Sequence, residues 1–238
     1  MSADSTSGKG AYAQVLKATS LIGGSEGIAI LIGIVQTKCV AIFLGPVGVG
    51  IVGTLQSLLA LATRVSGLGI QSSGVREISA AVSSGDEGQV ARTTGTLRRI
   101  CWLTGAVGAI LVAIFAAPLS VATFGSRDFT FTIFAVSWVV LMRAIQEGQR
   151  TLIQGNRRVG DLARMKIIGA AGGAVIAIVF YGTLGLSGIV PALLSLGVFN
   201  LILTWWFSRR IAVARISMGW GETFRRSGGL VRLGIVLM

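Results

Sequence analysis

Five ionisable side chains lie inside or near the ends of long apolar runs of the sequence. They are Glu26, Lys38, Arg64, Arg143 and Glu147. A charge placed in hydrocarbon costs about 2.5–3.5 kcal/mol on insertion scales, so each of these residues needs a structural or functional reason. Arginine suits phosphate because its planar group donates two hydrogen bonds at once and stays charged at any working pH. Arg64 and Arg143 are therefore candidate ligands for an anionic group.

Helical spacing places further polar side chains beside the two arginines. Seven-residue steps link Ser57, Arg64 and Gln71, and i, i+3, i+4, i+7 steps link Arg143, Gln146, Glu147 and Arg150. Each pattern repeats one face of a helix. Such polar stripes cannot face lipid, so they must face other helices or water. We expect a cation-lined cavity open to the cytoplasm, with these substrate-binding candidates: Arg64, Gln71, Arg143, Gln146 and Arg150.

A second interpretation gives the same charges a purely structural role. Arg64 and Arg143 would then extend to the inner headgroups, or pair with Glu26 and Glu147 as internal braces. The two glutamates are candidates either for such ion pairs or for binding a coupling ion. Lys38 is expected to extend to the outer interface.

The composition argues against several kinds of chemistry. The sequence has no histidine, which excludes Ser-His and Cys-His relays and most zinc sites. Cys39 and Cys101 lie in or beside apolar runs and are expected to be packing residues. The net charge of +12 does not indicate nucleic acid, because the cations fall between apolar runs. We expect no catalytic residues, no metal and no cofactor, and therefore no enzyme.

The elements that must position these residues are transmembrane helices. Hydrophobic residues make up 53% of the 238-residue chain and charged ones only 13%, with a mean hydropathy of +0.79. A soluble domain carries about 25% charged residues. The sequence predicts an all-α, polytopic transmembrane helical bundle with six complete spans, each of about 20 residues. The predicted spans are 19–44, 48–71, 100–123, 130–149, 167–184 and 187–207.

The connections between these spans predict the orientation and the domain organisation. Three connections are long and basic, at residues 72–99, 150–166 and 208–228. The turns at 45–47, at 125–129 and around Gly185 are short, and their only Lys or Arg residue is Arg127. By the positive-inside rule the N-terminus and the long loops are cytoplasmic. We expect a cytoplasmic segment (1–18), a six-helix lobe (19–207), an amphipathic linker on the inner leaflet (208–228) and the start of a seventh helix (229–238) that continues in a longer chain.

Local signals mark some helix ends and contacts. The sequence SGDE at 84–87 fits a capping box, so the third helix is expected to begin well before its span. Asp161 is expected to cap the fifth helix. Two GxxxG patterns, at Gly23 and Gly169, are typical of close helix contacts.

Four motifs in the right order carry a family resemblance. They are residues 43–50 (FLGPVGVG), residues 67–70 with 73–76 (GLGI and SGVR), residues 154–163 (QGNRRVGDLA) and residues 188–193 (GIVPAL). The chain thus resembles the bacterial O-antigen translocases and polysaccharide flippases. These belong to the multidrug, oligosaccharidyl-lipid and polysaccharide exporter superfamily.

This resemblance implies two six-helix lobes around a central cavity, of which this chain supplies the N-terminal lobe. It implies alternating-access transport of undecaprenyl-pyrophosphate-linked oligosaccharide across the bacterial inner membrane. The implied partners are this lipid-linked substrate, membrane lipids and the polysaccharide polymerase complex. Two other functions stay open. One is a small-molecule efflux antiporter of the same superfamily, and the other is a non-transporting scaffold of a glycan-assembly complex.

Overall fold

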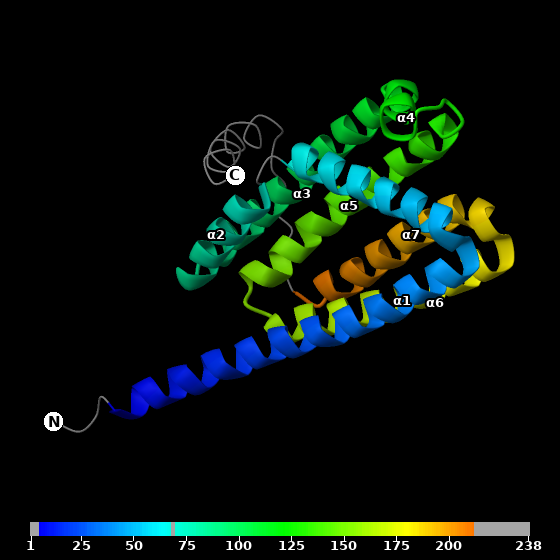
Figure 1. Ribbon diagram of the computed structural model, residues 1–238. Helices are drawn as coiled ribbons and strands as arrows, with labels where there is room; N and C mark the ends of the chain where they lie inside the picture. The colour runs from blue at the N-terminus through cyan, green and yellow to red at the C-terminus, as the bar shows by residue number, and fades with distance from the viewer. Residues whose placement is uncertain (1–4, 68–69, 212–238) are drawn as a thin grey trace.

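The computed structural model describes residues 5–67 and 70–211, and this part of the chain consists of helices joined by short turns, without strands (Figure 1). Its helices are α1 (Ser5–Gly67), α2 (Ile70–Ser83), α3 (Glu87–Ile114), α4 (Ala116–Phe124), α5 (Thr130–Gly155), α6 (Val159–Leu184) and α7 (Ile189–Ser208), with a short 3-10 turn, η1 (Gly185–Gly188), before α7.

Four stretches of the described chain are long and apolar enough to cross a membrane. They are Thr19–Gly67, Gly88–Ile114, Thr130–Gly155 and Val159–Ser208. Large apolar side chains point outward from them, including Ile42 at 78% and Phe131 at 75% exposure. An all-helical membrane protein is thereby confirmed. The six separate crossings stay a prediction, as do the domain limits, and residues 212–238 lie outside the described part.

Two of the four stretches are divided by a glycine with positive φ. In α1, Gly45 has φ 66° and ψ −175°, a conformation essentially restricted to glycine, and Pro46 follows without an N–H to donate. Figure 1 shows the second arm of α1 turning back at this bend. Gly185, with φ 56°, divides α6 from α7 in the same way. The reversals therefore lie where the sequence predicted short turns.

One expectation about a connection and one about a span are wrong. Residues 72–83 are not a loop, because they form most of α2. The predicted span 100–123 is also not continuous, because α3 ends at Ile114 and α4 begins at Ala116. Pro118 explains this break. It has no N–H for the Ile114 carbonyl, and its ring would clash with that carbonyl in a continuous helix.

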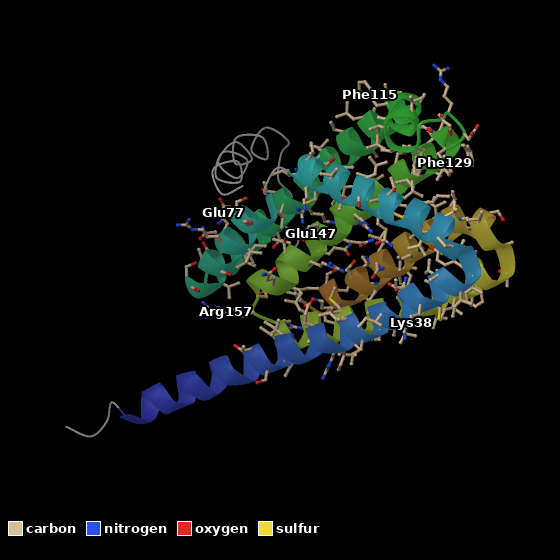
Figure 2. All side chains as sticks on the ribbon, viewed as in Figure 1. Lys38, Glu77, Phe115, Phe129, Glu147 and Arg157 are labelled. Carbon is tan, nitrogen blue, oxygen red and sulfur yellow. The ribbon has the colours of Figure 1, made fainter. Side chains whose placement is uncertain are left out.

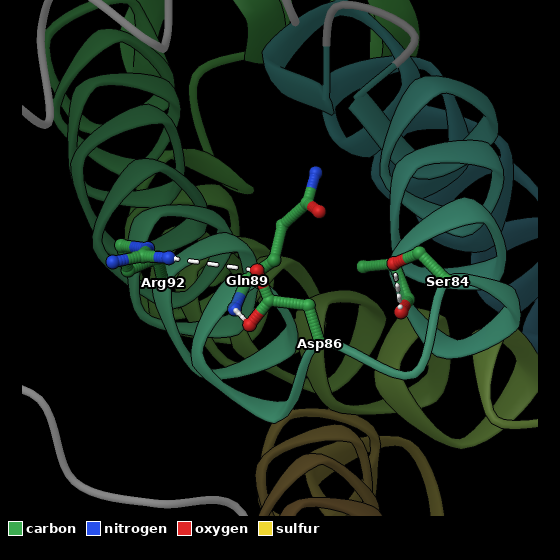
Figure 3. A network of polar contacts seen from close by, with 5 residues as sticks. Ser84, Asp86, Gln89 and Arg92 are labelled. Carbon is green, nitrogen blue, oxygen red and sulfur yellow. Dashed lines mark hydrogen bonds and ion pairs between the residues drawn. The ribbon is translucent and has the colours of Figure 1, made fainter.

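The helix caps differ from the predicted ones. Asp86, not Ser84, caps α3, because its carboxylate accepts a hydrogen bond from the Gln89 backbone N–H at 2.9 Å (Figure 3). Ser84 instead donates to the Ala81 carbonyl. Arg158, not Asp161, is at the N-cap position of α6, and Asp161 lies in its first turn. The expectation that the third helix begins well before residue 100 is confirmed.

The bundle is held together by close contacts of α5 with its neighbours. Fully buried Leu55 and Leu59 of α1 join Ile133, Val136 and Val140 of α5 in the largest apolar cluster. A second contact joins α5 to α2. The Gly155 position leaves no room for a Cβ atom, which would lie 2.5 Å from the Ile78 side chain. In addition, the Ser79 hydroxyl donates to the Gly155 carbonyl at 3.2 Å.

The two GxxxG patterns have different surroundings. At Gly169 and Gly173 a Cβ atom would lie 3.0 Å from side chains of α7, so this pattern forms the α6–α7 contact as expected. At Gly23 and Gly27 a Cβ atom would meet nothing within 4 Å among the described residues. The expectation of a close contact at Gly23 and Gly27 is therefore wrong for this part of the molecule.

Candidate functional site: a cation-lined cavity

A cavity of about 490 Å³ lies among α1, α2, α3, α5 and α7. This volume is in the range of small-molecule sites. The second arm of α1 contributes Arg64 to the wall, while α5 contributes Arg143, Gln146, Glu147 and Arg150. The two polar stripes that the sequence predicted on separate helices thus line the same cavity. Figure 2 shows Glu147 amid the helices, whereas Lys38 lies on the first arm of α1, where it is exposed and does not line the cavity.

The cavity carries an excess of positive charge. Three guanidinium groups line it, from Arg64, Arg143 and Arg150, against the single carboxylate of Glu147. The ion pairs within 4.0 Å that the described residues form lie elsewhere, and none of them joins Glu147 to one of these arginines. Arg64 and Arg150 are exposed, and Arg143 is partly buried. The guanidinium groups are therefore not neutralised by direct ion pairs within the described bundle.

Gln146 has a partner within the protein. Its side chain is only 6% exposed, and its Nε2 donates to the Gly197 carbonyl of α7 at 2.9 Å. Gly197 permits this approach, since a Cβ atom there would lie 3.0 Å from the Met142 sulfur. The hydrogen bond fixes the rotation of α5 against α7. It thereby holds Arg143, Glu147 and Arg150 toward the cavity, so Gln146 supports the site as well as lining it.

Glu26 lies outside the cavity. It forms an ion pair with Lys166 of α6, and both side chains are about half exposed. The pairing of Glu26 with Arg64 or Arg143, considered from the sequence, is therefore wrong. A role for Glu26 in binding a coupling ion stays a prediction.

Gln71 lies in α2, not at the end of a span, and its side chain is outside the described part. The nearby residues Gly67 and Ser72 line the cavity. Its assignment as a cavity residue stays a prediction.

Several cavity residues were missed from the sequence. Thr63, Cys101, Thr104, Thr151 and Asn200 line the cavity together with the predicted residues. Most are small polar residues within apolar runs, where a single hydroxyl or thiol does little to indicate a binding site. The available signal was helical spacing. Cys101 and Thr104 are three residues apart on α3, and Thr151 is one turn after Glu147 on α5.

The arrangement is suited to binding an anion. Arginine forms strong, bidentate hydrogen bonds with phosphate, and charges act more strongly inside a bundle than in bulk water. Within the described residues there is no group of three or more metal-ligating side chains. The cavity therefore combines an excess of guanidinium groups with neutral polar groups, which is a chemistry suited to an anion.

Comparison with known proteins identifies the family. The family model described as polysaccharide biosynthesis protein matches residues 15–227, which is most of the chain. This match confirms the resemblance carried by the four sequence motifs. No curated protein and no solved structure matches the chain significantly. The chain belongs to the polysaccharide biosynthesis protein family, and its long apolar helices identify it as a membrane protein of that family.

Proposed function

We propose that this protein is a flippase that moves undecaprenyl-pyrophosphate-linked oligosaccharide across the bacterial inner membrane. The cargo would be an O-antigen unit of lipopolysaccharide or the unit of another surface polysaccharide. Transport would proceed by alternating access, without making or breaking a covalent bond. The polymerase complex that receives the unit and the surrounding lipids would be its partners.

One observation carries the proposal: Arg64, Arg143 and Arg150 line a single cavity within an apolar bundle. A pyrophosphate cannot cross hydrocarbon unaided, because an unpaired buried charge is prohibitively costly. Guanidinium groups in a cavity replace the water that the pyrophosphate loses. The polyprenyl tail can remain in lipid, since it is as apolar as the acyl chains around it.

The physical principle of alternating access supports this mechanism. In many transporters a site near the middle of the membrane is exposed to one side and then the other as two helical units rock against each other. The second lobe that the sequence resemblance implies would supply the facing wall. The predicted cytoplasmic N-terminus would place the cavity toward the inner leaflet, where the lipid-linked unit is made.

The proposal is tested by replacing the cavity arginines in a strain that depends on this protein for surface polysaccharide. We expect Arg64→Ala and Arg143→Ala to abolish surface glycan without lowering the amount of protein in the membrane. Arg127→Ala is the matched control, because Arg127 lies between α4 and α5 and does not line the cavity. Wild-type export from both cavity variants would refute the proposal.

The same strains separate the alternative functions. An efflux antiporter of cationic drugs needs carboxylates in its cavity, whereas here guanidinium groups outnumber the carboxylate. Deletion of an antiporter would change the drug-resistance profile and leave surface glycan intact. A non-transporting scaffold would be required for glycan assembly in cells and would fail to translocate lipid-linked glycan after purification.

A further inference from the structure

Three threonine hydroxyls of the cavity donate their hydrogens to backbone carbonyls. Thr63 donates to the Leu59 carbonyl at 2.7 Å and Thr104 to the Ile100 carbonyl at 3.0 Å. Thr151 donates to the backbone carbonyl of Glu147 at 2.8 Å. A hydroxyl has one hydrogen and two lone pairs. Each of these threonines therefore offers a ligand only an oxygen acceptor.

Each of the two cavity amides donates one of its two N–H groups to a backbone carbonyl. Gln146 donates from Nε2 to the Gly197 carbonyl, and Asn200 donates from Nδ2 to the Leu196 carbonyl at 3.0 Å. Glu147 adds two carboxyl oxygens that accept hydrogen bonds. The cavity thus combines strong cationic donors with accepting oxygens from Glu147 and three threonines.

A ligand that matches this cavity must carry both negative charge and hydrogen-bond donors. A phosphate group alone would satisfy the arginines but would leave the oxygens without donors, and an unsatisfied buried acceptor is costly. Sugar hydroxyls are the donors that lie next to the phosphate in a glycosyl phosphate. The complement of this cavity is therefore a phosphate with its attached sugar.

The spacing on α5 agrees with this ligand. Glu147 follows Arg143 by four residues and precedes Arg150 by three, which separates them by about 6 Å and about 4.5 Å along the helix axis. Both arginines thus lie within about one turn of Glu147 on the same face of α5. A phosphate held by an arginine therefore brings the first sugar to Glu147.

We propose that Glu147, assisted by Thr104, binds the hydroxyls of the sugar attached directly to the phosphate and so determines specificity for that sugar. This inference rests on the proposed function and assigns a further role within the same cavity. The arginines bind the part common to all polyprenyl pyrophosphates. Glu147 and Thr104 distinguish lipids that carry a suitable sugar from those that carry none.

The test compares two ligands on the purified full-length protein in lipid nanodiscs. One is undecaprenyl pyrophosphate without sugar. The other is the same lipid bearing one sugar, taken from a panel of glucose, galactose and their N-acetylamino forms. For the wild type we expect tighter binding of at least one sugar-bearing lipid than of the sugar-free lipid. The measured quantity is the ratio of the two affinities.

Glu147→Gln removes the charged acceptor with little change of shape, and we expect this ratio to fall about tenfold, the effect of losing a hydrogen bond to a charged group. Loss of the negative charge alone tightens binding of both lipids and cancels in the ratio. Thr104→Val should lower the ratio about fivefold. Arg64→Gln should weaken the binding of both lipids and leave the ratio of their affinities unchanged.

Matched controls lie outside the cavity. Thr183→Val replaces a threonine of α6 that also donates to the backbone carbonyl four residues earlier. Glu26→Gln replaces the other carboxylate of the apolar runs. Neither should change the ratio, so a change limited to Glu147→Gln and Thr104→Val supports the inference.

A failure of the sugar-recognition inference and a failure of the proposed function give different results. If the wild type does not prefer any sugar-bearing lipid, or if the ratio is unchanged in Glu147→Gln and Thr104→Val, sugar recognition by these residues is refuted. The proposed function survives that result as long as Arg64→Gln weakens binding of both lipids. If the wild type binds neither lipid, or Arg64→Gln changes neither affinity, the proposed function fails and the inference fails with it.

Discussion

The positive charge of the cavity predicts that an anionic reagent enters it faster than a cationic one. Ala60 lines the cavity, is exposed, and precedes Arg64 by one helical turn. A cysteine at this position, in a background lacking Cys39 and Cys101, reports the local potential. The reagents are a methanethiosulfonate carrying a sulfonate and one carrying a quaternary ammonium group, each normalised to its rate with a small free thiol.

The size of the effect follows from the charges that line the cavity. Three guanidinium groups and one carboxylate give a net charge of two. At about 8 Å and the dielectric constant of water, each unit charge contributes about 0.5 kcal/mol. The sulfonate is then attracted by about 1 kcal/mol and the ammonium group is repelled by as much. We expect the normalised rate ratio to favour the sulfonate by about 30-fold, because about 1.4 kcal/mol corresponds to a factor of ten.

Two variants make this prediction sharp. Arg64→Gln halves the net charge, so the ratio should fall about fivefold, and added salt should lower it further. A cysteine at exposed Ser187, in the turn before α7, should give a ratio near one. A ratio near one at position 60, or the same ratio with and without Arg64, would refute the electrostatic reasoning.

Three further predictions concern the framework of the site. Gln146→Leu removes the α5–α7 hydrogen bond, and such a bond is worth about 0.6 kcal/mol in membrane proteins. The rate ratio at position 60 should therefore fall with little loss of thermal stability. An unchanged ratio would contradict the positioning role of Gln146. Gly45→Ala should destabilise the protein by about 1–3 kcal/mol because Gly45 has a positive φ. Gly50→Ala should not destabilise it, because Gly50 lies in a regular helix with open space around it. Equal melting temperatures for the two variants would contradict this explanation. Asp86→Ala should cost about 1 kcal/mol of unfolding free energy by removing the cap of α3, while Asp86→Asn should retain most of it; the explanation fails if both variants lose the same amount.

The main features of the site could be predicted because they depend on local periodicity. Arg143, Gln146, Glu147 and Arg150 share a helical face wherever α5 packs, and a polar face of an apolar helix turns inward. The reversal at Gly45 was predictable for a similar reason, since Gly-Pro cannot continue a helix without distortion. The family resemblance carried by the motifs was confirmed by the family match over residues 15–227.

The remaining features depend on tertiary structure or on competing local signals. The pairing of Glu26 with Lys166 joins residues 140 positions apart, which no spacing in either helix indicates. The break at Phe115 was missed because hydropathy is continuous through Pro118. The polar composition of residues 72–83 suggested a loop, although Ile78 of α2 is fully buried against α5. The capping box at residues 84–87 suggested Ser84 as the cap, whereas the structure has Asp86 at the N-cap position of α3.

The most direct test of the central claim is translocation by the purified protein in sealed vesicles. Undecaprenyl-pyrophosphate-linked glycan is placed in one leaflet, and its arrival in the other is followed with a membrane-impermeant lectin or glycosidase. We predict translocation by the wild type and its loss in the Arg64→Gln/Arg143→Gln double variant, with Arg127→Gln behaving as the wild type. Equal translocation by the double variant and the wild type, or none by the wild type, would contradict the claim that these guanidinium groups carry the acidic lipid head across the membrane.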